Sequence, residues 1–477
     1  MKTNLKVLFV TAEATPYAKT GGLADVAGSL PEVLAEMGVD IRVVLPGYKG
    51  IRAEQVYISD FPVKIGTRNT TCVLKQIREA SAVTYTVNNY HYYCRDGIYM
   101  HHDDGERFSF LCKASLELCR AIGFQPDIIH MNDWHAALIA VLLEKNYKKS
   151  DPFYRNIKTL LTIHNLEYQG HFEKNILNLL ELPEDLFTPE GVEFFGKFNF
   201  LKAGILYADK INTVSPTYAE EILMPAYGEG LEGVLLNRRR DLFGILNGIS
   251  YTQFNPEKDA YLPFSYNERD LSGKLRNKRE LQAELGLPAA DVPVISVIHR
   301  LVAQKGLDVV IEAFDRMMAM GVQFILLGIG DPRLEKTFTE LMRKYPEQVS
   351  VRIEFNEKLA HRIYSGSDIF LMPSRFEPCG LGQMISLRYG TIPVVRETGG
   401  LKDTVVDIEE DPDRGNGFTF KDLTPKDFIN TLERAVYVYR NEPGLWLDMV
   451  RRGMRLDFSW ENSAKKYLSI YNMALRG

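Results

Sequence analysis

Short apolar runs alternate with stretches of helical periodicity along the whole chain. In the first half these runs are KVLFVTAEA, DIRVVLP, PDIIHMND, KTLLTIHN and KINTVSP, at residues 6–14, 40–46, 126–133, 158–165 and 210–216. Continuous Val, Ile, Leu and Phe runs of this length are typical of parallel strands that are buried on both faces. Between them the pattern predicts helices over 23–37, 134–147 and 196–208. Ser215 and Pro216 suit the N-cap and first turn of another helix.

A second series of the same kind begins near residue 292. Its apolar runs lie at 292–300, 322–331, 349–356, 367–375 and 391–400. One of the helices between them is predicted over 307–318, where Leu, Val, Ile, Phe and Met recur at helical spacing. The last 50 residues have a helical pattern throughout. Alternation of strands and helices in both halves predicts an α/β protein with two Rossmann-like domains, each built on a parallel sheet.

Domain boundaries follow from length and from one polar stretch. A chain of 477 residues is too long for a single compact core. The stretch 250–275 is polar and rich in Tyr, Asn, Asp and Pro, which is typical of a linker. We therefore predict four segments: an N-terminal Rossmann-like domain over 1–245, a hinge or linker over 246–275, a C-terminal Rossmann-like domain over 276–455, and a C-terminal helix over 456–477 that packs back on the first domain.

Composition narrows the class of protein. The hydrophobic fraction of 45% and the charged fraction of 25% are ordinary for a globular protein. The net charge of −5, with scattered Lys and Arg, argues against nucleic-acid binding. Five cysteines without a Cys-x-x-Cys pair favour a reduced, intracellular protein over a disulfide framework or a zinc site. No signal peptide is recognisable and no apolar run approaches the roughly 18–20 residues of a membrane span, so we predict a cytoplasmic protein without a membrane partner.

The tetrapeptide Thr-Gly-Gly-Leu occurs twice, in AKTGGLADV at residues 18–26 and in RETGGLKDTV at residues 396–405. Each copy follows a predicted strand and opens a predicted helix. Ligands of open α/β sheets lie beyond the carboxyl ends of the strands, and backbone N–H groups at a helix start can bind an anion. We therefore expect Lys19–Leu23 and Thr398–Leu401 to face each other across an interdomain cleft that holds an anionic ligand.

Two further loops of the second half carry charged groups. HRLVAQKGLDVV places Arg300 and Lys305 on a strand-to-helix loop, which suits a diphosphate; solvated surface cations are the alternative. In PSRFEPCGLGQ, Glu377 precedes a Gly-rich helix start. A carboxylate there would repel phosphate, but it suits sugar hydroxyls or positive charge at an anomeric carbon; the alternative is a solvent-facing loop residue. Cys379 is interpreted as a packed thiol.

In the first half, Asp133 and His164 lie at the carboxyl ends of predicted strands. His164 is a candidate for contact with a ligand hydroxyl, whereas His130 and His135 are interpreted as structural. The Asp-Pro-Asp of residues 411–413 lies in an acidic loop with Pro and Gly, and is interpreted as a solvated turn. We predict no metal site.

Together these motifs resemble the bacterial glycogen synthases and plant starch synthases, which are retaining glucosyltransferases of the two-domain GT-B fold. The resemblance runs in the family's order through KTGGLADV, DWHAAL, TIHNLEYQG, RLVAQKGLD, PSRFEPCGLGQM and RYGTIPVVRETGGLKDTV. It implies transfer of glucose from a sugar nucleotide, ADP-glucose in most bacterial members, to the non-reducing end of an α-1,4-glucan such as a glycogen primer. It also implies that no cofactor is required.

The resemblance further implies roles for individual positions. Those that match catalytic groups are His164, Arg300, Lys305 and Glu377. Those that match donor-binding groups are Lys19, Gly22, Asp25, Asp133, Asn247, Phe355, Cys379, Gly380, Leu381, Thr398, Gly399 and Gly400. Arg300 and Lys305 would hold the diphosphate, and Glu377 would bind the transferred glucose. Phe355 would face the adenine. Asn132, Ser250 and His299 replace the family's more common His, Asp and Ser.

A retaining enzyme with a separate nucleophile needs two carboxylates about 5 Å apart. The sequence offers no evident partner for Glu377, so we predict a front-face reaction through an oxocarbenium-like state. In this reaction Arg300, Lys305 and helix termini stabilise the departing ADP, which itself can take the acceptor's proton.

Four alternatives remain open at this stage. One is the same reaction with UDP-glucose as the preferred donor, and another is a glucan-binding protein without activity. A third is an NAD-dependent oxidoreductase, although LLGIGD at residues 326–331 is an incomplete dinucleotide fingerprint. The fourth is a glycogen phosphorylase, which shares the fold but requires pyridoxal phosphate.

Overall fold

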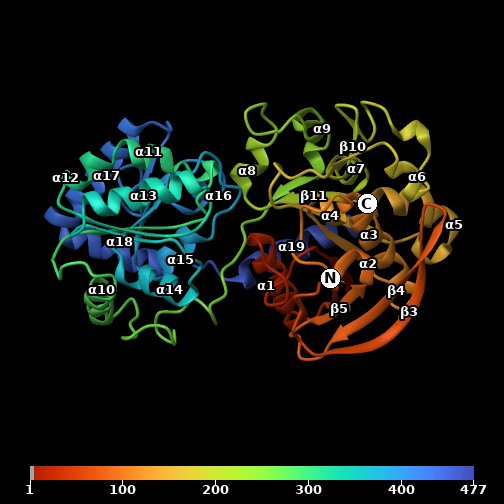
Figure 1. The fold of residues 1–477 in the computed structure, drawn as a ribbon, viewed down its shortest axis with the longest axis horizontal. Helices are drawn as coiled ribbons and strands as arrows, with labels where there is room; N and C mark the ends of the chain where they lie inside the picture. Colours follow the sequence, from red (N-terminus) through yellow and green to blue (C-terminus); the bar gives the residue numbers. More distant parts are fainter. Residues whose placement is uncertain (1–4, 477) are drawn as a thin grey trace. The chain divides into compact units, whose positions relative to one another are not determined.

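The structure, a computed structural model, describes residues 5–476 (Figure 1). The chain forms two compact units. Unit 1 contains the chain up to Leu246 together with the segment that begins at Trp460, and unit 2 contains Asn247–Ser459. Each unit is an α/β structure with its own sheet and buried core.

Unit 1 is built on a nine-stranded sheet with the order β12-β11-β7-β6-β1-β2-β5-β4-β3. Its strands are β1 (Lys6–Val10), β2 (Asp40–Pro46), β3 (Gln55–Ile65), β4 (Arg68–Ile77), β5 (Val83–Asn88), β6 (Ile128–Asn132), β7 (Lys158–Ile163), β11 (Lys210–Thr213) and β12 (Leu242–Gly244). All neighbours pair in parallel except β3 with β4 and β4 with β5, which are antiparallel. The prediction of a wholly parallel sheet is therefore wrong at this edge. Half-exposed strands of a hairpin lack the continuous apolar run that marks a buried parallel strand.

The principal helices of unit 1 flank this sheet. They are α1 (Gly22–Glu36), α3 (Asp104–Ala121), α4 (Asp133–Leu142), α7 (Phe200–Tyr207), α8 (Pro216–Glu221), α9 (Glu232–Asn237) and α19 (Trp460–Arg476). Smaller elements are α2 (Tyr90–Tyr93), α5 (Lys148–Ser150), α6 (Ile176–Leu180) and a second sheet of β8 (His171–Phe172), β10 (Lys197–Asn199) and β9 (Glu193–Phe194). In Figure 1 the blue α19 lies beside the red α1, although the two are at opposite ends of the chain. Trp460, Tyr467 and Tyr471 of α19 are buried in the same apolar cluster as β1 and α1.

Two local predictions in unit 1 have different outcomes. The helix expected over 196–208 begins only at Phe200, because Asn199 ends β10 and accepts a hydrogen bond from the Lys202 N–H at 2.8 Å as the helix cap. The cap at Ser215 is confirmed. Its hydroxyl accepts from the Tyr218 N–H at 2.9 Å, and Pro216 is the first residue of α8.

Unit 2 has a six-stranded sheet with the order β15-β14-β13-β16-β17-β18, and every pair is parallel. Its strands are β13 (Val294–Ile298), β14 (Gln323–Leu327), β15 (Val349–Arg352), β16 (Ile369–Met372), β17 (Ile392–Arg396) and β18 (Phe418–Phe420). Its helices are α10 (Ser272–Glu284), α11 (Leu307–Glu312), α12 (Phe314–Ala319), α13 (Pro332–Lys344), α14 (Glu357–Gly366), α15 (Gly382–Arg388), α16 (Gly399–Thr404), α17 (Pro425–Asn441) and α18 (Pro443–Arg455). The single helix expected over 307–318 is divided at Ala313.

The polar stretch before α10 is irregular but well packed within unit 2. The buried Tyr266 donates its hydroxyl hydrogen to the carbonyl oxygen of Tyr389 at 2.8 Å. The Asp259 carboxylate contacts His361 Nδ1 at 2.7 Å and accepts from the Tyr389 hydroxyl at 2.5 Å. Near its start, the Ile249 N–H donates to the Phe458 carbonyl at 2.8 Å. These contacts hold the stretch against the sheet-bearing part of unit 2.

Candidate active site

A buried ion pair lies at the carboxyl edge of the sheet in unit 2. Lys305 ends a single 3-10 turn (Ala303–Lys305) after β13, and Glu377 lies in the loop between β16 and α15. Lys305 Nζ is 2.6 Å from Glu377 Oε2, and the two side chains are only 12% and 8% exposed. The Ser374 hydroxyl donates to the same carboxylate oxygen at 2.9 Å. Two strand-exit loops that are far apart in the sequence therefore meet through opposite charges.

The electrostatic balance keeps Glu377 ionised. Burial by itself would raise the pKa of Glu377, but the positive charge of Lys305 and the hydrogen bonds from Lys305 and Ser374 outweigh it, so the pKa lies below its usual value. Burial, with the Lys305 charge next, lowers the pKa of the neighbouring His299 to about 3. At neutral pH the site thus combines a carboxylate, an ammonium group and an uncharged imidazole.

The second Thr-Gly-Gly-Leu loop packs directly on the Glu377 loop. The Gly400 N–H donates to the Glu377 carbonyl at 3.1 Å. Gly399 has φ +44°, and a Cβ there would lie 2.0 Å from the Glu377 carbonyl oxygen; a Cβ on Gly400 would lie 2.0 Å from that of Cys379. Only glycine permits this approach of two backbones. The structure therefore brings the predicted Thr398–Gly400 segment together with the Glu377 loop.

One residue of this loop pair was missed by sequence reasoning. Gln383, on α15, donates from Nε2 to the Cys379 carbonyl at 3.1 Å and to the Gly380 carbonyl at 3.0 Å. Gly380 has φ +76°, in the left-handed region that favours glycine. Leu381 is the next residue and directly precedes α15. Gln383 is the last residue of the motif PSRFEPCGLGQ, but its spacing from the other residues indicates no role, so only the structure shows that it holds this loop in place.

The remaining predicted positions of unit 2 differ in exposure. Arg300 is exposed and, within residues 5–476, makes no ion pair. Phe355 lies beyond the end of β15 with 79% of its surface exposed, which leaves its ring face open. Asn247 is buried, and its Oδ1 has no hydrogen-bond partner among the described residues. Cys379 is buried, in agreement with its interpretation as a packed thiol, and burial raises the pKa of this thiol to about 12.

In unit 1 the first Thr-Gly-Gly-Leu loop is arranged differently from the expectation. Lys19 Nζ lies 2.6 Å from Asp25 Oδ1, in the first turn of α1, and Gly22 opens that helix. The N–H groups of Thr20 and Gly21 donate to Glu13, at 2.5 and 3.1 Å. The expectation that the loop's amides are open to a ligand anion is thus wrong for these two groups, because a carboxylate of the protein occupies them.

His164 is held by two neighbours at the end of β6. The backbone N–H of His164 donates to Asp133 Oδ1 at 2.7 Å, and the ring Nε2 is 2.9 Å from Asn132 Oδ1. The Asn132 amide nitrogen donates to the Val10 carbonyl at 3.1 Å, so its oxygen faces the imidazole. His164 therefore carries its proton on Nε2, and Nδ1 is left as an acceptor. Burial lowers the His164 pKa to about 3, so the ring is neutral.

The two other histidines of this motif lie deeper. His130 is fully buried; its Nε2 contacts the Thr162 hydroxyl at 2.6 Å and its Nδ1 the Tyr471 hydroxyl at 2.8 Å. His135 is buried and stacks on Tyr99, with ring centroids 4.9 Å apart. Both side chains thus serve packing between elements of unit 1.

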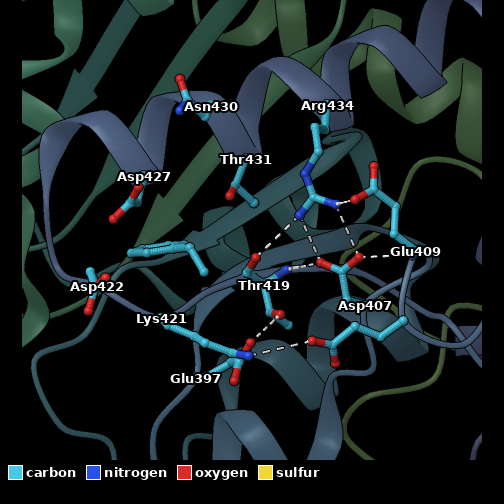
Figure 2. Close-up of a pocket in the computed structure, with 12 residues that line it drawn as sticks. Glu397, Asp407, Glu409, Thr419, Lys421, Asp422, Asp427, Asn430, Thr431 and Arg434 are labelled. Carbon is cyan, nitrogen blue, oxygen red and sulfur yellow. Dashed lines mark hydrogen bonds and ion pairs between the residues drawn. The ribbon is translucent and has the colours of Figure 1, made fainter.

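A separate hollow of about 350 Å³ lies near the carboxyl ends of β17 and β18 in unit 2 (Figure 2). Arg434 reaches across it to Asp407 at 2.9 Å and to Glu409 at 2.5 Å. The Thr419 hydroxyl donates to Glu397 at 2.9 Å. None of the positions predicted for the donor site lines this hollow. Across residues 5–476 no cluster of three or more His, Cys, Asp or Glu side chains is arranged to hold a metal ion.

Comparisons with known proteins found family models that match both halves of the chain and relatives that match its full length. Residues 6–237 match the family model for the starch synthase catalytic domain, and residues 278–437 match that for glycosyl transferases group 1. The glycogen synthase of Moorella thermoacetica is 50% identical over 478 residues, which cover 100% of this chain and 98% of that protein. The chain belongs to the glycogen synthase family. It is a glycosyltransferase, and a second glycogen synthase, from Desulforudis audaxviator, is 48% identical over 99% of the chain and 97% of that protein.

Solved structures show the fold of this glycogen synthase family member. The catalytic domain of starch synthase IV from Arabidopsis thaliana, determined with ADP and acarbose, matches with a TM-score of 0.93 and 34% identity, covering 99% of this chain and all of that one. The two-domain GT-B fold predicted from the motifs is thus confirmed. Sucrose-phosphate synthase from Thermosynechococcus elongatus, with a TM-score of 0.61 and 18% identity, shares the fold. Within the described part of the chain, no helix combines the length and apolarity that a bilayer crossing requires.

The environment of Asp133 predicts a pH effect on stability. Burial raises the pKa of this carboxyl from about 4 to about 7. The folded state therefore holds a proton that the unfolded state releases, so this group's stabilising contribution is complete below about pH 4 and is lost as pH rises through 7. Asp133→Asn keeps an acceptor for the His164 N–H and tolerates the φ of +54° at this position. As pH rises from 4 to 7, the wild type should lose stability relative to Asp133→Asn, so the melting temperature of the variant should increase relative to that of the wild type. The corresponding change in the free energy of unfolding is at most roughly 4 kcal/mol. Calorimetry measures the two melting temperatures. A difference between them that stays constant over this pH range would show that Asp133 is ionised throughout.

Proposed function

We propose that this chain transfers glucose from ADP-glucose to the non-reducing end of an α-1,4-glucan, with retention of configuration. The observation that carries this proposal is the buried Lys305–Glu377 pair at the carboxyl edge of the unit 2 sheet. A cation suits a diphosphate leaving group, and a fixed carboxylate next to it suits an electron-poor anomeric carbon. A protein that only binds glucan has no need for this combination. The likeness to a starch synthase determined with ADP and acarbose supports the choice of substrates.

The other predicted positions complete the proposed donor site. In unit 2, Arg300 is free of ion pairs among residues 5–476 and would bind the diphosphate together with Lys305. The open ring face of Phe355 suits stacking on adenine. In unit 1, Lys19 would contribute a third cation, and the Nδ1 of His164, which carries no proton, would accept a hydrogen bond from a sugar hydroxyl.

The surroundings of Glu377 support a front-face reaction. Its carboxylate is bonded to an ammonium group and a hydroxyl, which hold it in place next to the proposed leaving group. A carboxylate paired with a cation suits stabilisation of an oxocarbenium-like state, and the sequence offers no evident second carboxylate for a double displacement. In the proposed reaction the bond from the anomeric carbon to the ADP oxygen breaks first, the electron pair leaves with ADP, and the acceptor hydroxyl attacks from the same face. Its proton passes to the departing phosphate.

A single assay tests this function. Purified enzyme is incubated with a glucan primer and either ADP-glucose or UDP-glucose, and both nucleotide release and chain length are measured. We expect elongation with ADP-glucose and a lower kcat/KM with UDP-glucose, with α-1,4 linkages seen by NMR. A preference for UDP-glucose would reassign the donor. Nucleotide release without elongation, or no turnover with either donor, would refute the proposed transfer.

A further inference from the structure

Glu13 is a buried carboxylate with four hydrogen-bond donors around it. It lies in the loop after β1, six residues before Lys19, and only 3% of its surface is exposed. Its Oε2 accepts from the N–H groups of Thr20 at 2.5 Å and Gly21 at 3.1 Å. Its Oε1 accepts from the hydroxyls of Thr20 at 2.6 Å and Tyr99 at 2.5 Å. A buried carboxylate bonded on both oxygens has a fixed position.

This arrangement joins the first Thr-Gly-Gly-Leu loop to a distant part of unit 1. Burial, together with the charge of Glu13, raises the pKa of Tyr99, so the phenol keeps the proton that it donates. The Tyr99 ring in turn stacks on His135 of α4, at an interplanar angle of 27°. The loop is therefore fastened through Glu13 and Tyr99 to the helix that begins at Asp133.

The arrangement also decides which groups of the loop a ligand can reach. The amides of Thr20 and Gly21 lie just before the fifteen-residue helix α1, where backbone N–H groups can bind a ligand's anion. Glu13 occupies both amides. The Lys19 side chain is 44% exposed and is bonded to Asp25 rather than to Glu13, so it is the group of this loop that remains available.

We propose that Glu13 is a positioning residue for glucosyl transfer: it occupies the amides of Thr20 and Gly21 and so holds the loop in the shape that presents Lys19 to the donor diphosphate. The proposal rests on the proposed role of Lys19. Glu13 acts through the loop and does not touch the substrate. Its four bonds, not its charge, are what the loop requires.

An isosteric pair of variants separates these possibilities. In Glu13→Gln the side-chain oxygen can still accept from both amides, and the new NH₂ group can donate to the Thr20 and Tyr99 hydroxyls, which rotate to accept. Glu13→Ala removes all four bonds. We expect Glu13→Ala to lower kcat/KM for ADP-glucose by about 100-fold, the effect of a misplaced binding group, and Glu13→Gln to lower it by less than about tenfold.

Two further measurements show whether Glu13 acts through Lys19. Hydrogen exchange of the peptide over 14–24 should accelerate in Glu13→Ala and stay near wild type in Glu13→Gln, because the amides lose their acceptor only in the former. In a double-mutant cycle, Glu13→Ala in a Lys19→Ala background should cost little more than Lys19→Ala alone. Tyr99→Phe, which removes one donor, should fall between the two Glu13 variants and keeps the test available if Glu13→Ala does not fold.

Three results would overturn the proposal. If Glu13→Gln lost as much activity as Glu13→Ala while its exchange stayed unchanged, the charge itself would act on the substrate. If the losses from Glu13→Ala and Lys19→Ala multiplied, the two residues would act independently. Unchanged exchange in Glu13→Ala would mean that Glu13 does not order the loop. A fully active Lys19→Ala would instead refute the role proposed for Lys19, and the exchange measurement would still decide whether Glu13 holds the loop.

Discussion

Replacing Glu377 by glutamine is expected to lower kcat by at least ~100-fold, which is the loss that follows removal of one major electrostatic contact to a transition state. The amide keeps the volume of the side chain, and its oxygen can still accept from Lys305 and from the Ser374 hydroxyl. What disappears is the negative charge that would face the anomeric carbon. KM for ADP-glucose should change less than kcat, because this charge matters most when the carbon is electron-poor. The measurement is steady-state glucosyl transfer at saturating primer.

The choice of glutamine over alanine follows from burial. Glu377→Ala would leave the Lys305 ammonium in a largely buried site without its partner, and breaking a buried ion pair by removing one member is strongly destabilising. We therefore expect the melting temperature to fall less in Glu377→Gln, whose amide oxygen still accepts a hydrogen bond from Lys305, than in Glu377→Ala. Near-normal kcat in Glu377→Gln would refute the electrostatic role of this carboxylate, since folding could not then explain the result.

Lys305→Ala should be more damaging than Arg300→Ala. Removal of Lys305 takes away a cation and also leaves the buried Glu377 carboxylate unpaired, whereas Arg300 is exposed and has no ion-pair partner within residues 5–476. We expect kcat to fall by about 100- to 1,000-fold for Lys305→Ala and by about ten- to 100-fold for Arg300→Ala. Both variants should bind ADP more weakly in calorimetric titrations, because both groups are proposed to hold the diphosphate.

The double variant provides the control. If Arg300 and Lys305 bind the same leaving group, the fold reduction in kcat of the double variant should be smaller than the product of the two single reductions. Simple multiplication would mean that the two cations act on separate groups. Equal losses in the two single variants would show that the pairing of Lys305 with Glu377 has no consequence for catalysis.

Much of the architecture was predictable because buried parallel strands have a distinct composition. The run at 40–46 coincides with β2, and the five apolar runs of the second series contain five of the six parallel strands of unit 2. The short edge strand β18 (Phe418–Phe420) was not predicted. The edge hairpin of β3 and β4 was not recognised, since its strands are half exposed and their apolar positions are diluted by polar ones. The division of one predicted helix at Ala313 was also beyond reach, because no Gly or Pro marks it.

The residues of the candidate site were also predictable only in part. Each predicted loop after β13, β16 and β17 was found from local signals: cations before a helix, a carboxylate among glycines, and the repeated Thr-Gly-Gly-Leu. Glu13 and Gln383 carried no such signal, although each fastens one of these loops through several hydrogen bonds. Their importance depends on donors supplied by other segments, which a linear pattern does not display.

The sequence by itself determined the α/β class, the two series of strands, the family and the residue types that the chemistry needs, because each of these is written in local composition and spacing. Only the tertiary structure decided how those residues are joined. In the folded chain Lys305 forms an ion pair with Glu377, and the amides of Thr20 and Gly21 donate to Glu13. The Asn132 side-chain oxygen faces the His164 ring. The physical reason is that the strength of a charge or a hydrogen bond depends on distance and burial, and folding sets both between residues that the sequence keeps far apart.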